Sequence, residues 1–94
     1  MWKKQTYKIR LGDGEYGEVE GAVHGMWGID KRSNAYYILT HVPSGCRVES
    51  ARTMKFLKDL ATTPEFECYD KSDESLKKML GCIARFRNQY GWTA

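Results

Sequence analysis

The chain has 94 residues, of which 41% are hydrophobic and 13% aromatic, and its formal net charge is +3. This length allows one hydrophobic core and the composition is that of a folded domain, which excludes a two-domain enzyme and a disordered tail. No apolar run is long enough to cross a membrane and no secretory signal is visible, so we expect a single cytoplasmic domain over residues 1–94. The odd cysteine count, at spacings that match no disulfide framework, fits a reducing compartment.

The first half of the chain alternates apolar and polar residues with a period of two, which predicts β-strands. We expect strands at about 6–11, 18–29, 35–42 and 46–50. Within the longest of these, Val23, Trp27 and Ile29 would share one face of the sheet. The last two strands are joined by the turn Pro43-Ser44-Gly45, because proline presets φ and glycine allows a positive φ.

The second half shows helical spacing, with helices expected at about 54–62 and 73–90. Thr53 is the predicted N-cap of the first helix, and Pro64 follows its end because the residue before proline avoids the helical region. We expect a loop over residues 65–71, anchored to the core by Phe66 and Tyr69.

Ser72 is the predicted cap of the final helix, and Gly91 is its predicted stop. The pattern therefore predicts an α+β fold, in which a four-stranded antiparallel β-meander packs against two C-terminal helices.

The turn after the first strand spells G-x-G-x-x-G-x-V over residues 12–19, which resembles the glycine-rich phosphate loop of protein kinases. The segment after it alternates as a strand, the next strand has no lysine, and the acidic residues around the glycines would repel a phosphate. We interpret the resemblance as coincidental. The glycines are expected to make a hairpin turn that binds no nucleotide, and we expect no cofactor.

Charge is segregated along the chain, and residues 11–30 hold five acidic residues and no Lys or Arg. Acids on a projecting turn would form an anionic protrusion able to enter a basic groove of a partner. Such a groove is often where nucleic acid would lie. The candidate partner-binding residues are Asp13, Glu15, Tyr16, Glu18 and Glu20. The alternative is that these acids only keep an edge strand soluble.

Direct binding of nucleic acid is the second hypothesis, because basic residues interleave with aromatic ones that could stack on bases. The candidate residues are Lys3, Lys4, Lys31, Arg32, Lys77, Lys78, Arg85 and Arg87. Twelve acidic residues dilute this positive charge, and the isoelectric point of about 8.8 is below the range of a dedicated binder.

A metal site or a Cys-His nucleophile is the third hypothesis, because His41 and Cys46 flank one tight turn. The chain has no paired ligands such as C-x-x-C, and no third residue is evident that would orient the pair. A structural His41 that hydrogen-bonds its turn is the simpler interpretation. We therefore expect no metal and no catalytic residue.

The stretch Leu39–Gly45, followed by Arg52-Thr53 and a helix, resembles a strand-turn-strand-helix pattern of small proteins of phages and other mobile elements. The resemblance covers residues 35–61 and implies a mobile-element origin. The expected function is that of a non-enzymatic inhibitor of the anti-CRISPR type, which binds a host protein complex that handles nucleic acid. The sequence leaves open whether the protein dimerises.

Overall fold

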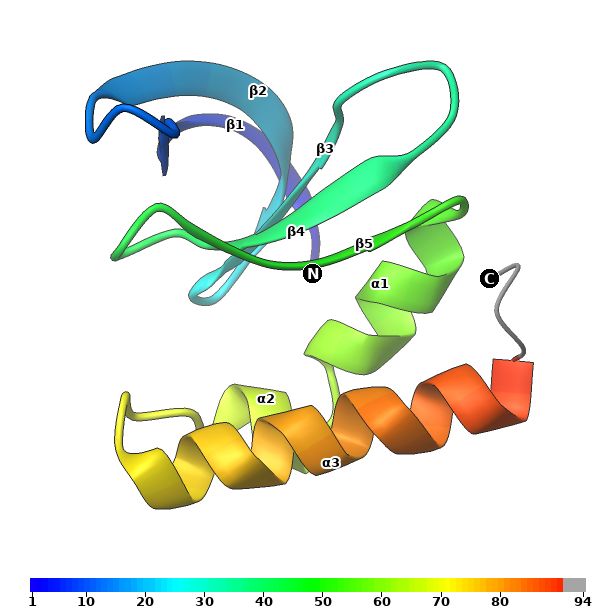
Figure 1. Cartoon of the computed structure of the whole chain (residues 1–94). Helices are drawn as coiled ribbons and strands as arrows, with labels where there is room; N and C mark the ends of the chain where they lie inside the picture. The colour runs from blue at the N-terminus through cyan, green and yellow to red at the C-terminus, as the bar shows by residue number, and fades with distance from the viewer. Residues whose placement is uncertain (91–94) are drawn as a thin grey trace.

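The structure is a computed structural model that describes residues 1–90. Five antiparallel strands form one sheet in the order β1-β2-β3-β4-β5, and the helices follow in the second half of the chain (Figure 1). The strands are β1 (Lys3–Arg10), β2 (Tyr16–His24), β3 (Trp27–Lys31), β4 (Tyr37–His41) and β5 (Cys46–Ala51), and the helices are α1 (Met54–Ala61), α2 (Pro64–Glu67) and α3 (Asp73–Tyr90). The predicted α+β class is confirmed, and the predicted count of four strands is wrong.

The extra strand arises because the single strand predicted over residues 18–29 is a hairpin. His24 pairs with Trp27, so that only Gly25 and Met26 connect β2 to β3. Gly25 has a φ of 60°, the left-handed conformation that glycine adopts at the first position of a two-residue hairpin turn. The turn reverses the chain without interrupting the apolar–polar alternation, which is why the period alone did not reveal it.

The turn also changes which residues share a face. Trp27 lies opposite His24 and Ile29 lies opposite Ala22, so the apolar residues of β3 are on the other face from Val23. Trp27 and Ile29 pack into the main core. That core lies between the sheet and the helices and includes Trp27, Ile29, Leu39, Ala51, Phe56, Leu57, Leu60, Ala61, Phe66, Met79 and Cys82.

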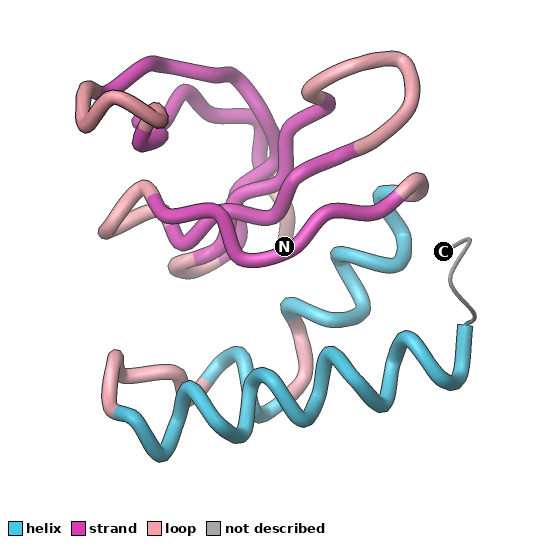
Figure 2. The backbone as a smooth tube through the Cα atoms, in the orientation of Figure 1, coloured by secondary structure: helices cyan, strands magenta, loops and turns pink. Residues whose placement is uncertain are grey.

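The face of the sheet that points away from the helices is covered by β1 and β2, which curl over it (Figure 2). The main-chain N–H of Arg10 donates a 2.9 Å hydrogen bond to the carbonyl of Gly45, which ties the end of β1 to the β4–β5 turn. Tyr7, Ile9 and Ile38 are buried outside the main core cluster. The central strands β3 and β4 are therefore buried on both faces.

The helices begin where the sequence predicted, with one addition. The Thr53 hydroxyl accepts a hydrogen bond from the N–H of Phe56, which confirms the N-cap of α1. Residues 65–71 are not all loop, because Pro64 occupies the first turn of the short helix α2, a position where its missing N–H costs nothing. Phe66 is fully buried, as expected.

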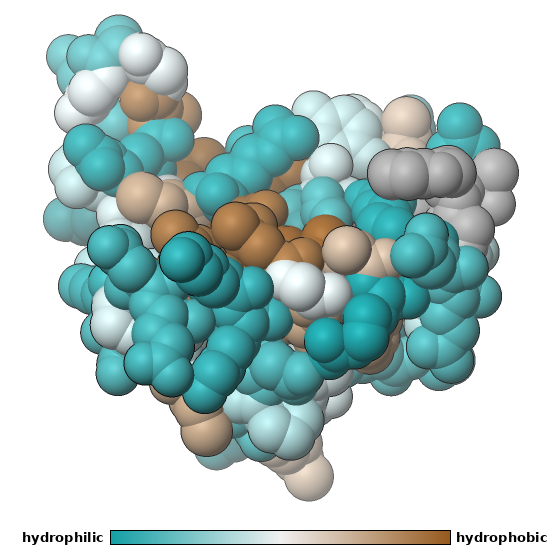
Figure 3. All heavy atoms as spheres, turned by 60° about the horizontal axis from the view of Figure 1, so that its bottom comes forward, coloured by the Kyte–Doolittle hydropathy of each residue, from teal (hydrophilic) through white to brown (hydrophobic). Residues whose placement is uncertain are grey.

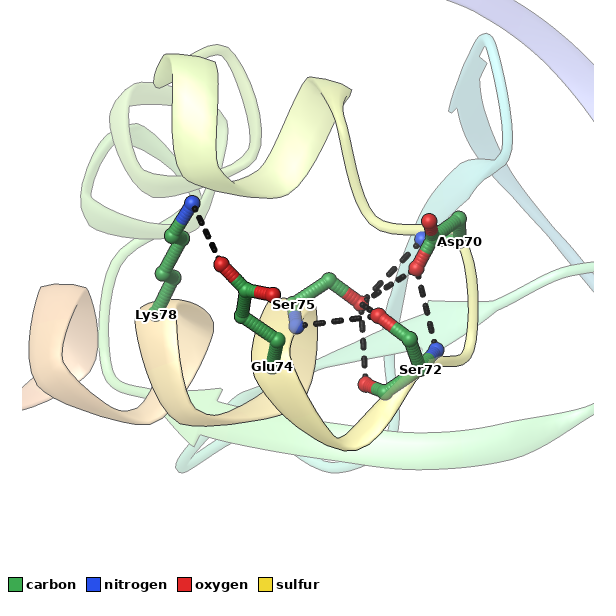
Figure 4. Close-up of polar contacts among 5 residues, drawn as sticks. All are labelled: Asp70, Ser72, Glu74, Ser75 and Lys78. Carbon is green, nitrogen blue, oxygen red and sulfur yellow. Dashed lines mark hydrogen bonds and ion pairs between the residues drawn. The ribbon is translucent and has the colours of Figure 1, made fainter.

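A network of serine hydroxyls holds the start of α3 (Figure 4). The Ser72 hydroxyl accepts from the N–H of Ser75 at 3.1 Å, which confirms Ser72 as the cap. Asp70 accepts hydrogen bonds from the Ser72 N–H and the Ser75 hydroxyl. The predicted stop at Gly91 lies outside the described residues. No helix of residues 1–90 is long and apolar enough to cross a membrane.

Candidate interaction site

The tip of the β1–β2 hairpin is a tight loop whose hydrogen bonds are local. The N–H of Leu11 donates to the carbonyl of Glu15 at 2.8 Å, and the N–H of Gly14 donates to the carbonyl of Leu11 at 3.1 Å. The Asp13 carboxylate accepts from the N–H of Glu15 at 3.1 Å, an Asx turn. These bonds give the tip a defined shape with its acidic side chains exposed.

The acids on the strands of this hairpin face basic residues of β1. Lys4 Nζ lies 3.3 Å from Glu20 Oε1, and Glu18 is directly opposite Lys8 in the register. Residues 3–24 contain four basic and four acidic residues, so the hairpin as a whole is neutral. Of the five residues predicted to bind a partner, the structure places Asp13, Glu15 and Tyr16 at or beside the tip and gives Glu18 and Glu20 basic neighbours.

Two large apolar side chains flank the acids of the tip. Tyr16 is 57% exposed and Leu11 is 43% exposed. The first strand was predicted over about 6–11 and so included Leu11, which was not predicted as an interaction residue. The missing information was the length of β1, which ends at Arg10 and leaves Leu11 in the loop.

Most of the cations proposed to bind nucleic acid are engaged in ion pairs. Arg32 pairs with Asp30 at 2.9 Å, and three cations of α3 pair with nearby acids. Those three pairs are Lys78 with Glu74, Arg85 with Glu65, and Arg87 with Glu49. Ion pairing reduces the positive field that the basic C-terminal helix was expected to present.

A separate basic groove lies beside the N-terminus, where Lys3, Lys4 and Lys31 come together. It has a volume of about 340 Å³ and is also lined by Trp2 and Lys58. Lys58 Nζ lies 5.8 Å from the centre of the Trp2 ring, within the range of a cation–π contact. Lys58 was not predicted, because only the packing of α1 against the sheet brings it to this groove.

The structure brings His41 and Cys46 together as directly opposed residues of β4 and β5. Each is hydrogen-bonded to Ser44: His41 Nδ1 lies 2.8 Å from the Ser44 hydroxyl, and the Cys46 thiol donates to the Ser44 carbonyl. The His41 ring also packs against Trp27 and Tyr69. These contacts favour the structural interpretation of His41.

The two side chains have shifted acidities. Burial, assisted by the charge of Lys71, lowers the pKa of His41, which favours the neutral imidazole. Hydrogen bonding to the side chains of Ser44 and Arg10 lowers the pKa of the Cys46 thiol. Within the described part of the chain, no three His, Cys, Asp or Glu side chains are grouped so that they could hold a metal ion.

Comparison with protein-family models, curated proteins and solved structures found no match to this chain. Function therefore has to be inferred from the surface itself, since a fold alone does not determine it.

Proposed function

We propose that this protein is a non-catalytic binding protein that inserts the tip of its β1–β2 hairpin into a basic-rimmed groove of a protein partner. The partner class that fits this chemistry is a host complex that handles nucleic acid, and the biological role would be that of a phage or mobile-element inhibitor of the anti-CRISPR type. In this role the tip occupies the groove in place of the phosphate backbone.

The observation that carries the proposal is the combination of shape and chemistry at the tip. The hairpin projects from the body of the molecule (Figure 3), and its end presents exposed Leu11 and Tyr16 beside Asp13 and Glu15. Tyrosine is enriched among the residues that dominate binding energy, and acidic neighbours steer such an element toward a positive surface. Local hydrogen bonds hold the tip in shape, so little conformational freedom is lost on binding.

Neutralising the acids of the tip tests the proposal. Asp13→Asn with Glu15→Gln removes two charges and keeps the side-chain oxygen that closes the turn. Glu18→Gln with Glu20→Gln is the matched control, because it removes the same charge from the strands, where Lys8 and Lys4 already balance it.

The assay is affinity capture of partners from host lysate, with and without nuclease, followed by titration of the captured complex. We expect the tip pair and Tyr16→Ala each to weaken binding by about tenfold or more, since loss of a central anchor commonly costs at least 1.4 kcal/mol. We expect the strand pair to bind nearly as tightly as the wild type. If the tip pair and the strand pair weaken binding equally, or if neither pair weakens it, the assignment of partner binding to the tip would be refuted.

Direct binding of nucleic acid is a second candidate function, and the groove at Trp2 and Lys58 is the observation that favours it. Its four lysines (Lys3, Lys4, Lys31 and Lys58) lie around an aromatic ring on which a base could stack. Only Glu20 among the lining residues is acidic, and it is paired with Lys4.

A mobility-shift assay with a single-stranded oligonucleotide at low salt tests this candidate. If it holds, affinity falls steeply with added salt, and Lys31→Glu with Lys58→Glu abolishes the shift. Lys77→Glu on α3 is the contrasting variant and should have a smaller effect. Absence of any shift at low salt would eliminate direct binding.

A further inference from the structure

Helix α3 leaves much of its apolar stripe uncovered by the rest of residues 1–90. Met79 and Cys82 are buried against the core, whereas Leu76 is 39% exposed and Leu80 is 55% exposed. Leu76, Leu80 and Ala84 are spaced by four residues and so lie along one side of the helix. An apolar face of this kind on a small domain is a signature of an interaction surface.

The uncovered stripe forms one wall of a groove whose other wall is β5 and the β4–β5 turn. Two adjoining cavities of about 440 and 480 Å³ share Leu80. Their apolar lining comes from Val48, Leu76, Met79, Leu80, Ile83 and Ala84. Figure 3 shows this face, with a band of hydrophobic atoms across its middle bordered by hydrophilic ones.

The charged residues of the groove are predominantly basic. Arg47 and Lys71 line the first cavity, which has no acidic lining residue. In the second cavity the only acid is Glu49, which pairs with Arg87 at 3.2 Å. The groove therefore favours an acidic occupant, and a second copy of this chain would bring the same cations against it.

The free edge of β5 is poorly suited to accept an added strand, because both of its ends are engaged. The carbonyl of Gly45, just before β5, accepts from the N–H of Arg10, and the carbonyl of Ser50 accepts from the Arg87 guanidinium. Along α3, by contrast, the lining runs from Leu76 to Asn88, about 18 Å of helix at 1.5 Å per residue. This length and the regular spacing of the stripe match about three turns of a second helix packed alongside.

We infer that the groove between β5 and α3 docks an acidic amphipathic helix of a partner protein. The apolar stripe of that helix lies on Leu76, Leu80 and Ile83, and its carboxylates face Arg47 and Lys71. This surface is separate from the hairpin tip, so it gives the protein a second contact that does not depend on the function proposed above.

The probe is a fluorescein-labelled 15-residue helical peptide with leucines along one side and glutamates on the other, and its partner peptide has lysine in place of every glutamate. Fluorescence anisotropy should show saturable binding of the acidic peptide to the full chain and at least tenfold weaker binding of the basic one. Leu80→Glu should lower affinity for the acidic peptide at least tenfold, and so should Arg47→Glu with Lys71→Glu.

The matched control is Leu11→Glu, which makes the same change at a comparably exposed leucine of the hairpin tip and should leave peptide affinity unchanged. Because Leu80 is more than half exposed, Leu80→Glu should remain folded by circular dichroism. If Leu80→Glu is unfolded, the test is made on the wild-type protein: the NMR shift changes caused by the acidic peptide must map to α3 and β5 for the inference to hold.

Three outcomes would overturn the inference. The first is equal binding of the acidic and basic peptides, and the second is no saturable binding at millimolar peptide. The third is a wild-type dimer by light scattering that Leu80→Glu converts to a monomer, which would make a second copy the occupant.

Discussion

Strand β2 passes so close to β3 at Gly21 that no side chain fits there. A Cβ at this position would lie 2.2 Å from the main-chain oxygen of Ile29 and 2.9 Å from the hydroxyl of Tyr7. Carbon–oxygen contacts are normally about 3.3 Å or longer. Gly21→Ala must therefore move β2 and β3 apart by about 1 Å, or twist one of them.

The expected cost follows from two effects. Overpacking a well-packed interior costs about 1–3 kcal/mol, and separating the strands weakens the hydrogen bonding around the Ala22–Ile29 pair by about 1 kcal/mol. We expect the free energy of unfolding to fall by about 3 kcal/mol, a large share of the 5–15 kcal/mol typical of a domain. The melting temperature should fall by roughly 12–24 °C.

Urea unfolding followed by circular dichroism measures this loss, and Gly12→Ala is the matched control. A Cβ on Gly12 meets no atom within 4 Å, so that variant should stay within about 0.5 kcal/mol of the wild type. If Gly21→Ala were as stable as Gly12→Ala, the close approach of β2 to β3, and with it the curl of the sheet, would be refuted.

Three further outcomes are expected. Trp27→Phe removes the indole donor of a 3.1 Å hydrogen bond to the Phe66 carbonyl, which keeps a 3.3 Å hydrogen bond from the N–H of Tyr69, so the free energy of unfolding should drop by about 0.5–1.5 kcal/mol in urea titrations. Hydrogen bonds from serines at the start of α3 lower the pKa of Asp70 to about 2. The contribution of the ionised Asp70 to stability is complete above the ordinary carboxyl pKa and is lost as pH falls through about 2. Ser75→Ala should raise the pKa of Asp70, measured by carbon NMR. The lowered pKa of the Cys46 thiol should shift the pH midpoint of its alkylation, followed by peptide mass spectrometry, below that of an ordinary cysteine.

The two pKa outcomes each have a variant that separates the cause of the shift from a general loss of structure. Arg10→Gln should move the alkylation midpoint of Cys46 upward, since it removes one of the two hydrogen bonds that stabilise the thiolate. An unchanged midpoint would assign the shift to Ser44 alone. An Asp70 titration that Ser75→Ala does not move would contradict the serine network, and wild-type stability of Trp27→Phe would contradict the indole bond.

The two longer helices were predictable from the sequence because their ends carry strong local signals, whereas the short α2 was expected to be loop. Thr53 and Ser72 cap α1 and α3 where their side chains indicated, and the predicted helix over 73–90 coincides with α3. The sheet was harder, because a two-residue turn at Gly25 leaves the alternating pattern intact while exchanging the faces. The strand count therefore depended on one glycine whose conformation the pattern does not encode.

The surface was less predictable than the fold, because charge in a sequence does not reveal pairing across strands. The acids of β2 were read as one anionic block, but the register places Glu18 opposite Lys8, and Glu20 forms an ion pair with Lys4. Leu80 followed the helical spacing of a core residue, yet nothing in residues 1–90 covers it fully. Both results come from tertiary contacts, which local periodicity cannot supply.

The hydrogen bonds at the hairpin tip are local, so the surface of the tip can change without affecting the stability of the fold. The hydrogen bonds that shape the loop run among Leu11, Asp13, Gly14 and Glu15, and a Cβ on Gly12 would meet open space. Substitutions in this loop can change the surface of the tip while leaving the buried residues on both faces of the sheet untouched. Under the proposed function, the sequence of this loop can therefore change to match a different partner while the fold is kept, and the loop could be exchanged in an engineered binder.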